Sequence, residues 1–505
     1  MNFLIYLFFA IFPAFQATDP QTFPDIYTGS FTPANSMIYY GGALSDILGV
    51  ASSEAGDINN DGIPDFLISD SMHNNGRGIV YVVYGKQGSL RDMSSLDDFS
   101  SDDGFTIKGG AINQRLGVAV SRAGDINNDG FDDILIGSDG WSSDQGMAYV
   151  IYGKDGSSNL GNIDLGVSSL DPSRGFQIFG ISSYDRTGFA VSYAGDVNGD
   201  QKGDIMVGAY HVGYGAGRAF IIYGQNGDFQ DIQLPPATGK GFTVSGSGTE
   251  NFGSTLSDIG DFNGDGVDDI IIGAHCADNW KGRAYIIYGN SAGFPDSMTA
   301  PTASAQGVMF QGISSSDNFG CQVSDAGDVN GDGLKDVIIG AYGSNGYRGS
   351  AYVVLGSSAY GASLGMASLG ATQGYRVISG EAEVLGAFVG GGRDLNGDGI
   401  SDVIIGGPSW HGNQGSLYIL YGKESSVFSQ VDVSAGWSAA QGLKLRGEQA
   451  GDNFAAFAST LQDVNLDGVN DLIVGAIDAH SGKGAAYLLY VPCKWLFLGE
   501  SLIIF

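Results

Sequence analysis

The chain has 505 residues, and its 55 Asp and Glu against 23 Lys and Arg give a formal net charge of −32. A chain so poor in basic residues disfavours DNA, RNA and anionic membrane surfaces as partners. Its three cysteines, Cys276, Cys321 and Cys493, are too few for a disulfide framework.

The chain begins with an apolar run from Phe3 to Phe12, which has the length of a signal-peptide core and is too short to span a bilayer. We therefore predict a signal peptide over residues 1–17, a secreted or cell-surface protein, and no transmembrane helix. No Lys or Arg precedes the run, and Phe15 stands where a small residue is preferred before cleavage. A buried N-terminal strand is the alternative.

A nine-residue pattern, Asp-x-Asn-x-Asp-Gly-x-x-Asp, organises the rest of the chain and occurs seven times. The copies begin at Asp57, Asp125, Asp196, Asp261, Asp328, Asp394 and Asp463, which are 68, 71, 65, 67, 66 and 69 residues apart. This regular period indicates one supersecondary unit repeated, not seven domains. Position 6 is glycine in six copies, where the backbone has to turn back, and Gln201 in the third.

Each copy gathers three carboxylates and one amide oxygen in a tight loop. Ca²⁺ takes roughly six to eight oxygen ligands, which the side chains at positions 1, 3, 5 and 9, the carbonyl of position 7 and waters can supply. The alternative is an Asx-rich turn without metal, since Asp, Asn and Gly form turns in any case. Seven repeats of packed carboxylates, which repel one another without a cation, favour calcium, with up to seven ions per chain. The expected ligands, in the order of positions 1, 3, 5, 7 and 9, are Asp57, Asn59, Asp61, Ile63 and Asp65; Asp125, Asn127, Asp129, Phe131 and Asp133; Asp196, Asn198, Asp200, Lys202 and Asp204; Asp261, Asn263, Asp265, Val267 and Asp269; Asp328, Asn330, Asp332, Leu334 and Asp336; Asp394, Asn396, Asp398, Ile400 and Asp402; and Asp463, Asn465, Asp467, Val469 and Asp471.

Short apolar runs follow these loops in a fixed order. Position 12 is Ile or Val in every copy, not the Glu of a helix-loop-helix calcium hand, and it lies in β-branched runs such as DIIIGA. In the second unit we expect strands at 115–121, 133–138, 146–153 and 175–180. Four short strands per unit predict a propeller blade, so seven units predict an all-β, seven-bladed β-propeller over residues 18–492 with a short tail at 493–505. Its repeats start near residues 37, 105, 176, 242, 309, 375 and 443.

The seventh unit lacks an obvious fourth strand. The N-terminal segment SMIYYGGALSDILGVAS (36–52) parallels GFTIKGGAINQRLGVAVS (104–121), so residues 37–41 are expected to complete blade 7 and lock the ring. Such closure removes exposed sheet edges. The alternative closure uses LFLGES (496–501).

Alternating strand direction places the loops between strands 1 and 2 on one face of the disc and the loops between strands 2 and 3 on the other. All five histidines and several Trp and Tyr lie in the second set of loops, which suits recognition of a protein or glycan ligand. The alternative is that these side chains only cap the blade ends. No GxSxG or HExxH motif is present, so we predict a binding module and not an enzyme. The expected ligand-face residues are His73, Trp141, His211, His275, Trp280, Trp410, His411 and His480.

The unit starts ILGVAS, RLGVAVS, RTGFAVS, NFGSTLS and NFGCQVS, with LIGS, MVGA, IIGA, IIGG and IVGA after the loops, resemble the Phe-Gly/Gly-Ala-Pro (FG-GAP) repeats of integrin alpha-subunit propellers. The resemblance covers about residues 36–490 and implies a calcium-binding adhesion module. In that family the module pairs with an integrin beta-type partner, and the sequence does not say whether this chain has one. Integrin alpha propellers carry calcium in only some blades, whereas all seven qualify here. The same repeats occur in secreted phospholipase D specific for glycosylphosphatidylinositol, which makes a carbohydrate-binding or accessory propeller of a glycan- or GPI-lipid-acting system the alternative.

Overall fold

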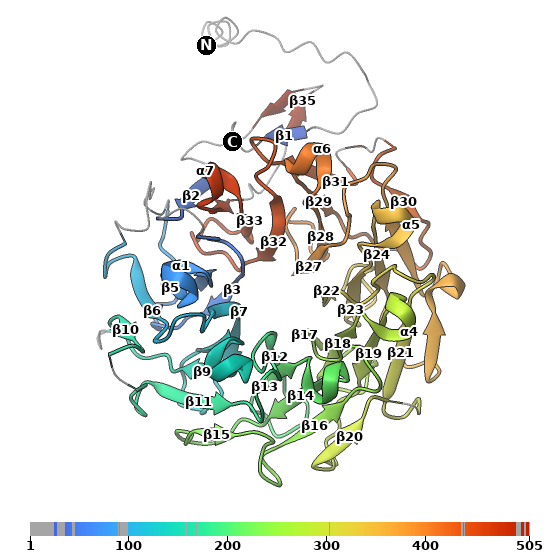
Figure 1. The fold of residues 1–505 in the computed structure, drawn as a ribbon. Coiled ribbons are helices and arrows are strands. Elements are labelled where there is room, and N and C mark those ends of the chain that lie inside the picture. Colours follow the sequence, from blue (N-terminus) through green and yellow to red (C-terminus); the bar gives the residue numbers. More distant parts are fainter. Residues whose placement is uncertain are drawn as a thin grey trace, which may run out of the picture.

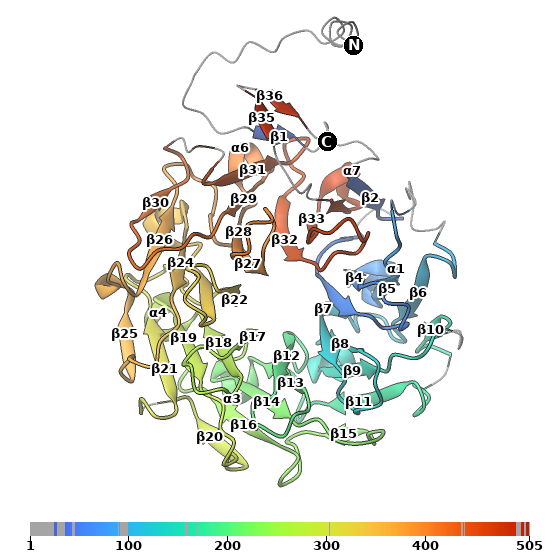
Figure 2. The same cartoon turned by 180° about the vertical axis from the view of Figure 1, so that it is seen from behind.

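The computed structural model describes residues 25–27, 36–42, 46–88, 90, 99–156, 160–167, 169–301, 303–435, 438, 440–490, 496–498 and 501–503. The predicted signal peptide, residues 1–17, lies outside them. Seven sheets stand around a central axis, one for each repeat, as Figures 1 and 2 show from the two faces. The all-β, seven-bladed propeller predicted from the repeat is confirmed.

Each blade contains four antiparallel strands, with the first nearest the axis and the fourth at the outside. Blades 1 to 4 consist of β3 (Ser52–Gly56), β4 (Asp65–Asp70), β5 (Ile79–Val83) and β6 (Gly104–Lys108); β7 (Leu116–Gly124), β8 (Asp133–Ser138), β9 (Met147–Ile151) and β11 (Gly175–Phe179); β12 (Val191–Gly195), β13 (Asp204–Ala209), β14 (Arg218–Ile222) and β16 (Gly241–Ser245); and β17 (Thr255–Gly260), β18 (Asp269–Ala274), β19 (Arg283–Ile287) and β21 (Gly307–Gln311). Blades 5 to 7 consist of β22 (Val323–Gly327), β23 (Asp336–Gly340), β24 (Ser350–Val354) and β26 (Gly374–Ile378); β27 (Phe388–Arg393), β28 (Asp402–Gly407), β29 (Ser416–Leu420) and β31 (Gly442–Arg446); and β32 (Phe454–Thr460), β33 (Leu472–Ala476), β34 (Ala485–Leu489) and β2 (Ser36–Tyr40).

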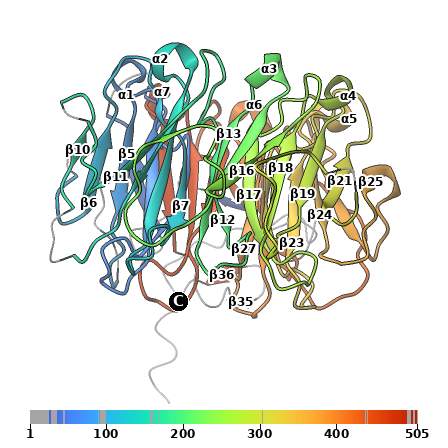
Figure 3. The ribbon, with the colours of Figure 1, turned by 90° about the horizontal axis from the view of Figure 1, so that it is seen from below.

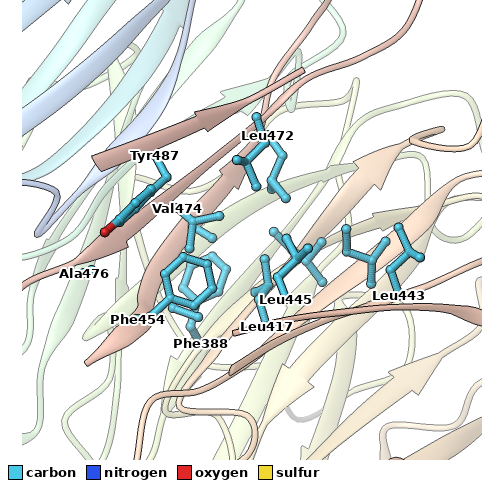
Figure 4. Packing of buried hydrophobic residues seen from close by; sticks show 14 of the residues in the cluster. Phe388, Leu417, Leu443, Leu445, Phe454, Leu472, Val474, Ala476 and Tyr487 are labelled. Carbon is cyan, nitrogen blue, oxygen red and sulfur yellow. The ribbon is translucent and has the colours of Figure 1, made fainter. Parts of the chain in front are cut away.

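The hydrophobic core consists of layers between neighbouring blades. Figure 4 shows one layer, in which Phe388 and Leu417 of blade 6 pack with Phe454 and Val474 of blade 7. Both faces of a blade are covered in this way, so the second strands are buried at every residue in β4, β8, β13, β18 and β28. Burial on both faces explains why these strands are continuous apolar runs without polar alternation.

The N-terminal strand β2 completes blade 7. It pairs antiparallel with β34, from Ser36 opposite Leu489 to Tyr40 opposite Ala485. Met37 and Tyr39 are 1% and 0% exposed, which anchors the strand in the interblade core. The alternative closure through residues 496–501 is wrong, because β35 (Leu496–Leu498) and β36 (Ser501–Ile503) pair with each other instead.

Six blades carry a short fifth strand, parallel to the outer fourth strand, that the sequence patterns did not predict. In blades 1 to 5 it comes from the connection between strands 3 and 4 of the next blade, and in blade 6 it comes from the N-terminal segment. These strands are β10 (Ile163–Asp164), β15 (Ile232–Gln233), β20 (Ser297–Thr299), β25 (Ser363–Gly365), β30 (Val431–Asp432) and β1 (Asp25–Tyr27). A 3₁₀ turn, η3 (Met366–Ser368), follows β25. The fifth strands cover edges that would otherwise be open to association.

Each connection between strands 2 and 3 is a helical turn, and Figure 3 shows these turns along one rim of the disc. We call this rim the helix face. The turns are α1 (His73–Gly76), α2 (Trp141–Asp144), α3 (Val212–Gly215), α4 (Ala277–Trp280), α5 (Ser344–Tyr347), α6 (Trp410–Asn413) and α7 (Ala479–Gly482). In the part of the chain that the structure describes, no helix has the length and apolar character needed to cross a membrane.

Candidate calcium loops and the opposite face

The seven acidic loops join the first and second strands of each blade and share one backbone arrangement. In the first loop, Asp57 Oδ1 accepts a hydrogen bond from the N–H of Asp61 at 3.0 Å, and Asp57 Oδ2 accepts one from the N–H of Gly62 at 2.8 Å. Asn59 Oδ1 also accepts from the Asp61 N–H, at 2.9 Å. The two bonds to the first residue recur in the other six loops. The side chains at positions 1 and 3 therefore fold back over their own loop.

The Asp at position 9 begins the second strand in blades 1 to 6 and directly precedes it in blade 7, and it is fully buried in every blade. In blade 2, Asp133 accepts hydrogen bonds from the N–H groups of Gly153 and Ile126 at 2.9 and 3.1 Å. Burial, followed by the nearby carboxylates of Asp129 and Asp125, raises the pKa of Asp133 to about 8. The same causes raise the pKa at position 9 to about 8 in blades 3 and 4 and to about 7 in blades 5 and 6. A buried, ionised carboxylate among other carboxylates is costly without a cation.

This donor set fits calcium. Positions 1, 5 and 9 of each loop would supply carboxylate oxygens, position 3 an amide oxygen and position 7 a carbonyl, all hard ligands. Calcium there would supply the positive charge that position 9 needs. In the described residues, however, no loop brings three acidic ligand atoms within 4.8 Å of one another. The side chains at positions 1 and 5 are less buried than position 9, so they are the ones that would move to share an ion.

Acidic loops are also hydrogen-bonded to the segment that follows the third strand of the next blade. The N–H groups of Lys154 and Gly156 in blade 2 donate to the carbonyls of Ile58 and Asn59 in the first loop, at 3.0 and 2.6 Å. The ring closes in the same manner, because Lys86 and Gly88 of blade 1 donate to Val464 and Asn465 of the seventh loop, at 2.9 and 2.8 Å. Each of these loops is therefore part of an interface between two blades.

The third loop differs from the others at position 6. Gln201 has φ of 68°, close to the left-handed values of the glycines that occupy position 6 elsewhere. Its N–H still donates to Asp196 Oδ2 at 2.7 Å, so the loop keeps its shape with a strained non-glycine residue.

The eight expected ligand-face residues all lie on the helix face, opposite the acidic loops, in or beside the short helical turns. They are spread over six blades and do not converge on one site. Trp280, His211, His411 and His480 are exposed. His73 and Trp141 are partly buried, and Trp141 packs against Phe179 with ring centroids 5.5 Å apart.

Trp410 corrects the sequence prediction, because it is only 3% exposed and is not a surface residue. Two cations from β31 lie over its ring, with Lys444 Nζ 4.4 Å and the Arg446 guanidinium 4.3 Å from the centroid. His411 stacks on it with ring centroids 3.8 Å apart, and Trp410 Nε1 donates to Glu381. Both cations lie on β31, and the sequence of the loop around Trp410 does not predict that this strand lies next to it.

The first strands of all seven blades enclose a central cavity of about 770 Å³. His275 of the helix face reaches this cavity, where Ser254 Oγ lies 3.0 Å from its Nδ1 and burial lowers its pKa. At the other end, Arg122 of blade 2 pairs with Glu54 of blade 1 at 3.0 Å and with Asp258 of blade 4 at 3.1 Å. Arg393 of blade 6 also pairs with Glu54. An ion-pair network therefore joins four blades across the axis.

Sequence reasoning missed this network, although a signal for it exists. Glu54, Arg122, Asp258 and Asp325 each stand three residues before the first Asp of their loop, at the same point of the repeat. Charged residues at one repeat position are brought together when the ring closes, because equivalent positions face the same axis.

The comparisons with known proteins agree with this architecture. The FG-GAP repeat family matches residues 117–151, 254–287, 323–354 and 385–420, within the first three strands of blades 2, 4, 5 and 6. Integrin alpha pat-2 of Caenorhabditis elegans is 29% identical over 255 residues, which cover 48% of this chain and 18% of that protein. Integrin alpha-5 of Xenopus laevis is 28% identical over 247 residues, or 46% of this chain and 21% of that one.

Phosphatidylinositol-glycan-specific phospholipase D of Homo sapiens is 34% identical over 178 residues, which cover 31% of this chain and 19% of that protein. The chain thus spans about a fifth of the length of these relatives. Among solved structures, Sqt1 from Chaetomium thermophilum has a TM-score of 0.40 at 11% identity, covering 90% of this chain and 98% of that one. The four FG-GAP matches, the similarity to integrin alpha subunits and the ring of seven sheets together support an integrin alpha-like β-propeller with FG-GAP repeats.

Proposed function

We propose that this propeller is an extracellular binding module of the adhesion type, stabilised by up to seven Ca²⁺ and holding a protein ligand on its helix face. The similarity to integrin alpha subunits and the signal-peptide-like run at Phe3 to Phe12 support the class and the location. The repeated oxygen donor set supports calcium in the loops. Ligand and metal then occupy opposite faces of the disc.

The observation that carries the ligand face is a row of exposed aromatic side chains on three consecutive blades. Tyr214 of α3 is 93% exposed, Trp280 of α4 is 48% exposed and Tyr347 of α5 is 55% exposed. Tyr and Trp contribute most to the binding energy of protein interfaces. Each of the three is held on a short turn between two buried strands, which gives a rigid support for recognition.

Binding to immobilised extracellular-matrix proteins, measured by surface plasmon resonance in calcium, tests this proposal. Substituting Tyr214, Trp280 or Tyr347 by Ala should weaken binding to a matrix protein by about 5- to 150-fold, the effect of losing roughly 1–3 kcal/mol. The matched control is Val427→Ala, which truncates a 58% exposed apolar side chain in a connection between strands 3 and 4. The proposal fails if Val427→Ala weakens binding and the three aromatic variants do not.

A second candidate is a carbohydrate-binding or accessory propeller for a glycan- or GPI-lipid-acting system. It is favoured by the 34% identity to phosphatidylinositol-glycan-specific phospholipase D. A glycan array probed with the same four variants separates the two functions. Glycan binding that depends on the aromatic row, together with no binding to matrix proteins, would select this candidate.

A further inference from the structure

Blade 1 contains a cluster of one histidine and two aspartates that the acidic loops do not include. Asp46 precedes β3, Asp70 ends β4, and His73 begins α1 on the helix face (Figure 1). Asp46 and Asp70 are 4% and 2% exposed, whereas the side chain of His73 is 34% exposed. The two carboxylates are therefore buried, whereas solvent reaches the imidazole of His73.

The separations within the cluster are those of ligands around one ion. His73 Nδ1 lies 3.5 Å from Asp46 Oδ2 and 3.9 Å from Asp70 Oδ2, and all three ligand atoms lie within 4.8 Å of one another. Both distances exceed the range of about 2.7–3.2 Å for a hydrogen bond. Two ligands bound to one tetrahedral ion at about 2.1 Å are roughly 3.4 Å apart. In the described residues, this is the one such group of His, Cys, Asp or Glu.

The rest of the propeller shows that the fold does not require this cluster. At the position of Asp70, the other blades have Ser138, Ala209, Ala274, Ala341, Gly407 and Ala476, all small residues. At the position of His73 they have Trp141, Val212, Ala277, Ser344, Trp410 and Ala479. By contrast, Asp46 stands where every blade has a buried acid or amide, such as Gln114 and Glu250. Blade 1 has thus added a second carboxylate and an imidazole to a structural acid.

The added carboxylate is unfavourable in its present surroundings. Asp70 Oδ1 accepts hydrogen bonds from the N–H groups of Met72 and Ile47, at 3.1 and 3.2 Å, and Oδ2 is on the side of His73. Asp70 is thus a buried carboxylate whose Oδ2 lies close to a second buried carboxylate, that of Asp46. A cation between the two carboxylates would remove this cost. In blade 2 an arginine supplies the positive charge beside a buried carboxylate, because Arg115 Nε lies 2.8 Å from Asp139.

We propose that Asp46, Asp70 and His73 bind one Zn²⁺ ion at a site distinct from the seven calcium loops. An imidazole nitrogen is a poor ligand for Ca²⁺ and a good one for Zn²⁺, and two carboxylates with one imidazole make three protein ligands. Three protein ligands leave a fourth position for water or for a group from a ligand. Because His73 begins α1, the site lies on the helix face.

The test is the Zn²⁺ content of the tag-free full chain after dialysis against micromolar Zn²⁺ in excess Ca²⁺, which keeps the oxygen-only loops occupied by calcium. We expect one Zn²⁺ per chain by mass spectrometry, and at least a 10-fold loss of affinity by calorimetry in His73→Ala and in Asp70→Ala. Asp70→Ala introduces the residue that other blades carry at this position, so it preserves the fold; circular dichroism in calcium confirms this.

The matched control is His480→Ala. His480 lies in α7 at the other side of the ring closure and packs edge-on against Tyr40, with ring centroids 4.0 Å apart, instead of facing two carboxylates. It should retain the wild-type Zn²⁺ content. The proposal is overturned if the wild-type chain takes up no Zn²⁺ in excess Ca²⁺, or if both His73→Ala and Asp70→Ala retain it.

Discussion

Asp132 of the second acidic loop accepts a hydrogen bond at 2.9 Å from the backbone N–H of Asp57, the first residue of the first loop. The approach is close enough that a Cβ on Gly56 would lie 2.2 Å from Asp132 Oδ2. Asp268 makes the same contact with the N–H of Asp196 at 2.8 Å. These bonds tie the acidic loops of neighbouring blades together.

Asp132→Ala should lower the free energy of unfolding by about 1 kcal/mol, since a partly exposed, charge-assisted hydrogen bond between blades is lost. Urea denaturation in calcium measures this change. The control is Asp102→Ala, which removes the same charge from an exposed residue for which the structure describes no hydrogen bond. Equal stability of the two variants would show that the contact between loops contributes nothing.

Removing calcium should destabilise the whole ring, because the buried carboxylate at position 9 of each loop loses its counter-charge. Differential scanning calorimetry with and without EDTA is the measurement, and adding excess Ca²⁺ should restore the original melting temperature. EDTA already saturated with Ca²⁺ is the control for effects of the chelator itself. An unchanged melting temperature in EDTA would contradict calcium binding by the loops.

Gln201→Gly should stabilise the third loop, because a non-glycine residue at φ of 68° costs on the order of 1 kcal/mol. The reciprocal change, Gly266→Gln in the fourth loop at φ of 86°, should destabilise by a similar amount. Calcium titration calorimetry and urea denaturation of both variants check the pair. Changes of the same sign in the two variants would rule out backbone strain as the cause.

Asp325, which is partly buried and lines the central cavity, should make stability depend on pH. Enclosure near the axis, and then Asp258, raises its pKa to about 6, although Lys335 and Arg393 oppose the rise. The native state therefore binds a proton that the unfolded chain releases between about pH 4 and pH 6, so the stability from this group is present below pH 4 and lost as pH rises to 6. Asn at this position cannot titrate.

The unfolding free energy of Asp325→Asn, minus that of the wild type, should thus increase from pH 4 to pH 7 by up to roughly 3 kcal/mol. Urea denaturation at a series of pH values gives this difference, in which the titration of the other carboxylates cancels. Asp102→Asn serves as the exposed control. A difference that stays constant with pH would mean that Asp325 titrates normally.

Truncation of Trp410 should destabilise the protein strongly, whereas truncation of Trp280 should hardly affect its stability. Trp410→Ala removes a ring that is 3% exposed and in contact with two cations, so it should cost about 3–5 kcal/mol of unfolding free energy. Trp280→Ala removes a ring that is 48% exposed and should change stability by less than about 0.5 kcal/mol. Urea denaturation decides this, and similar losses in both variants would contradict the assignment.

Much of the architecture could be predicted because the sequence repeat determines it. The period of the acidic loops gives the number of blades, and the missing fourth strand of the last unit points to residues 37–41, of which β2 contains 37–40. Strand alternation places the acidic loops and the histidines on opposite faces. The glycine pattern at position 6 predicts the left-handed backbone found at Gln201. These features depend on local geometry and on contacts between neighbouring strands, which a repeat carries in its own residues.

Which of the predicted residues are accessible, and which distant residues meet, follows from the packing of the blades against one another. Trp410 is buried because side chains of β31 and His411 cover its ring. Arg393 pairs with Glu54, 339 positions earlier, because the propeller closes around an axis. Asp46, Asp70 and His73 form a cluster only because the segment before β3, the end of β4 and the start of α1 meet at one corner of blade 1. Such contacts depend on how far each blade turns relative to the next. That rotation results from side-chain packing between sheets, which no periodicity in the sequence records.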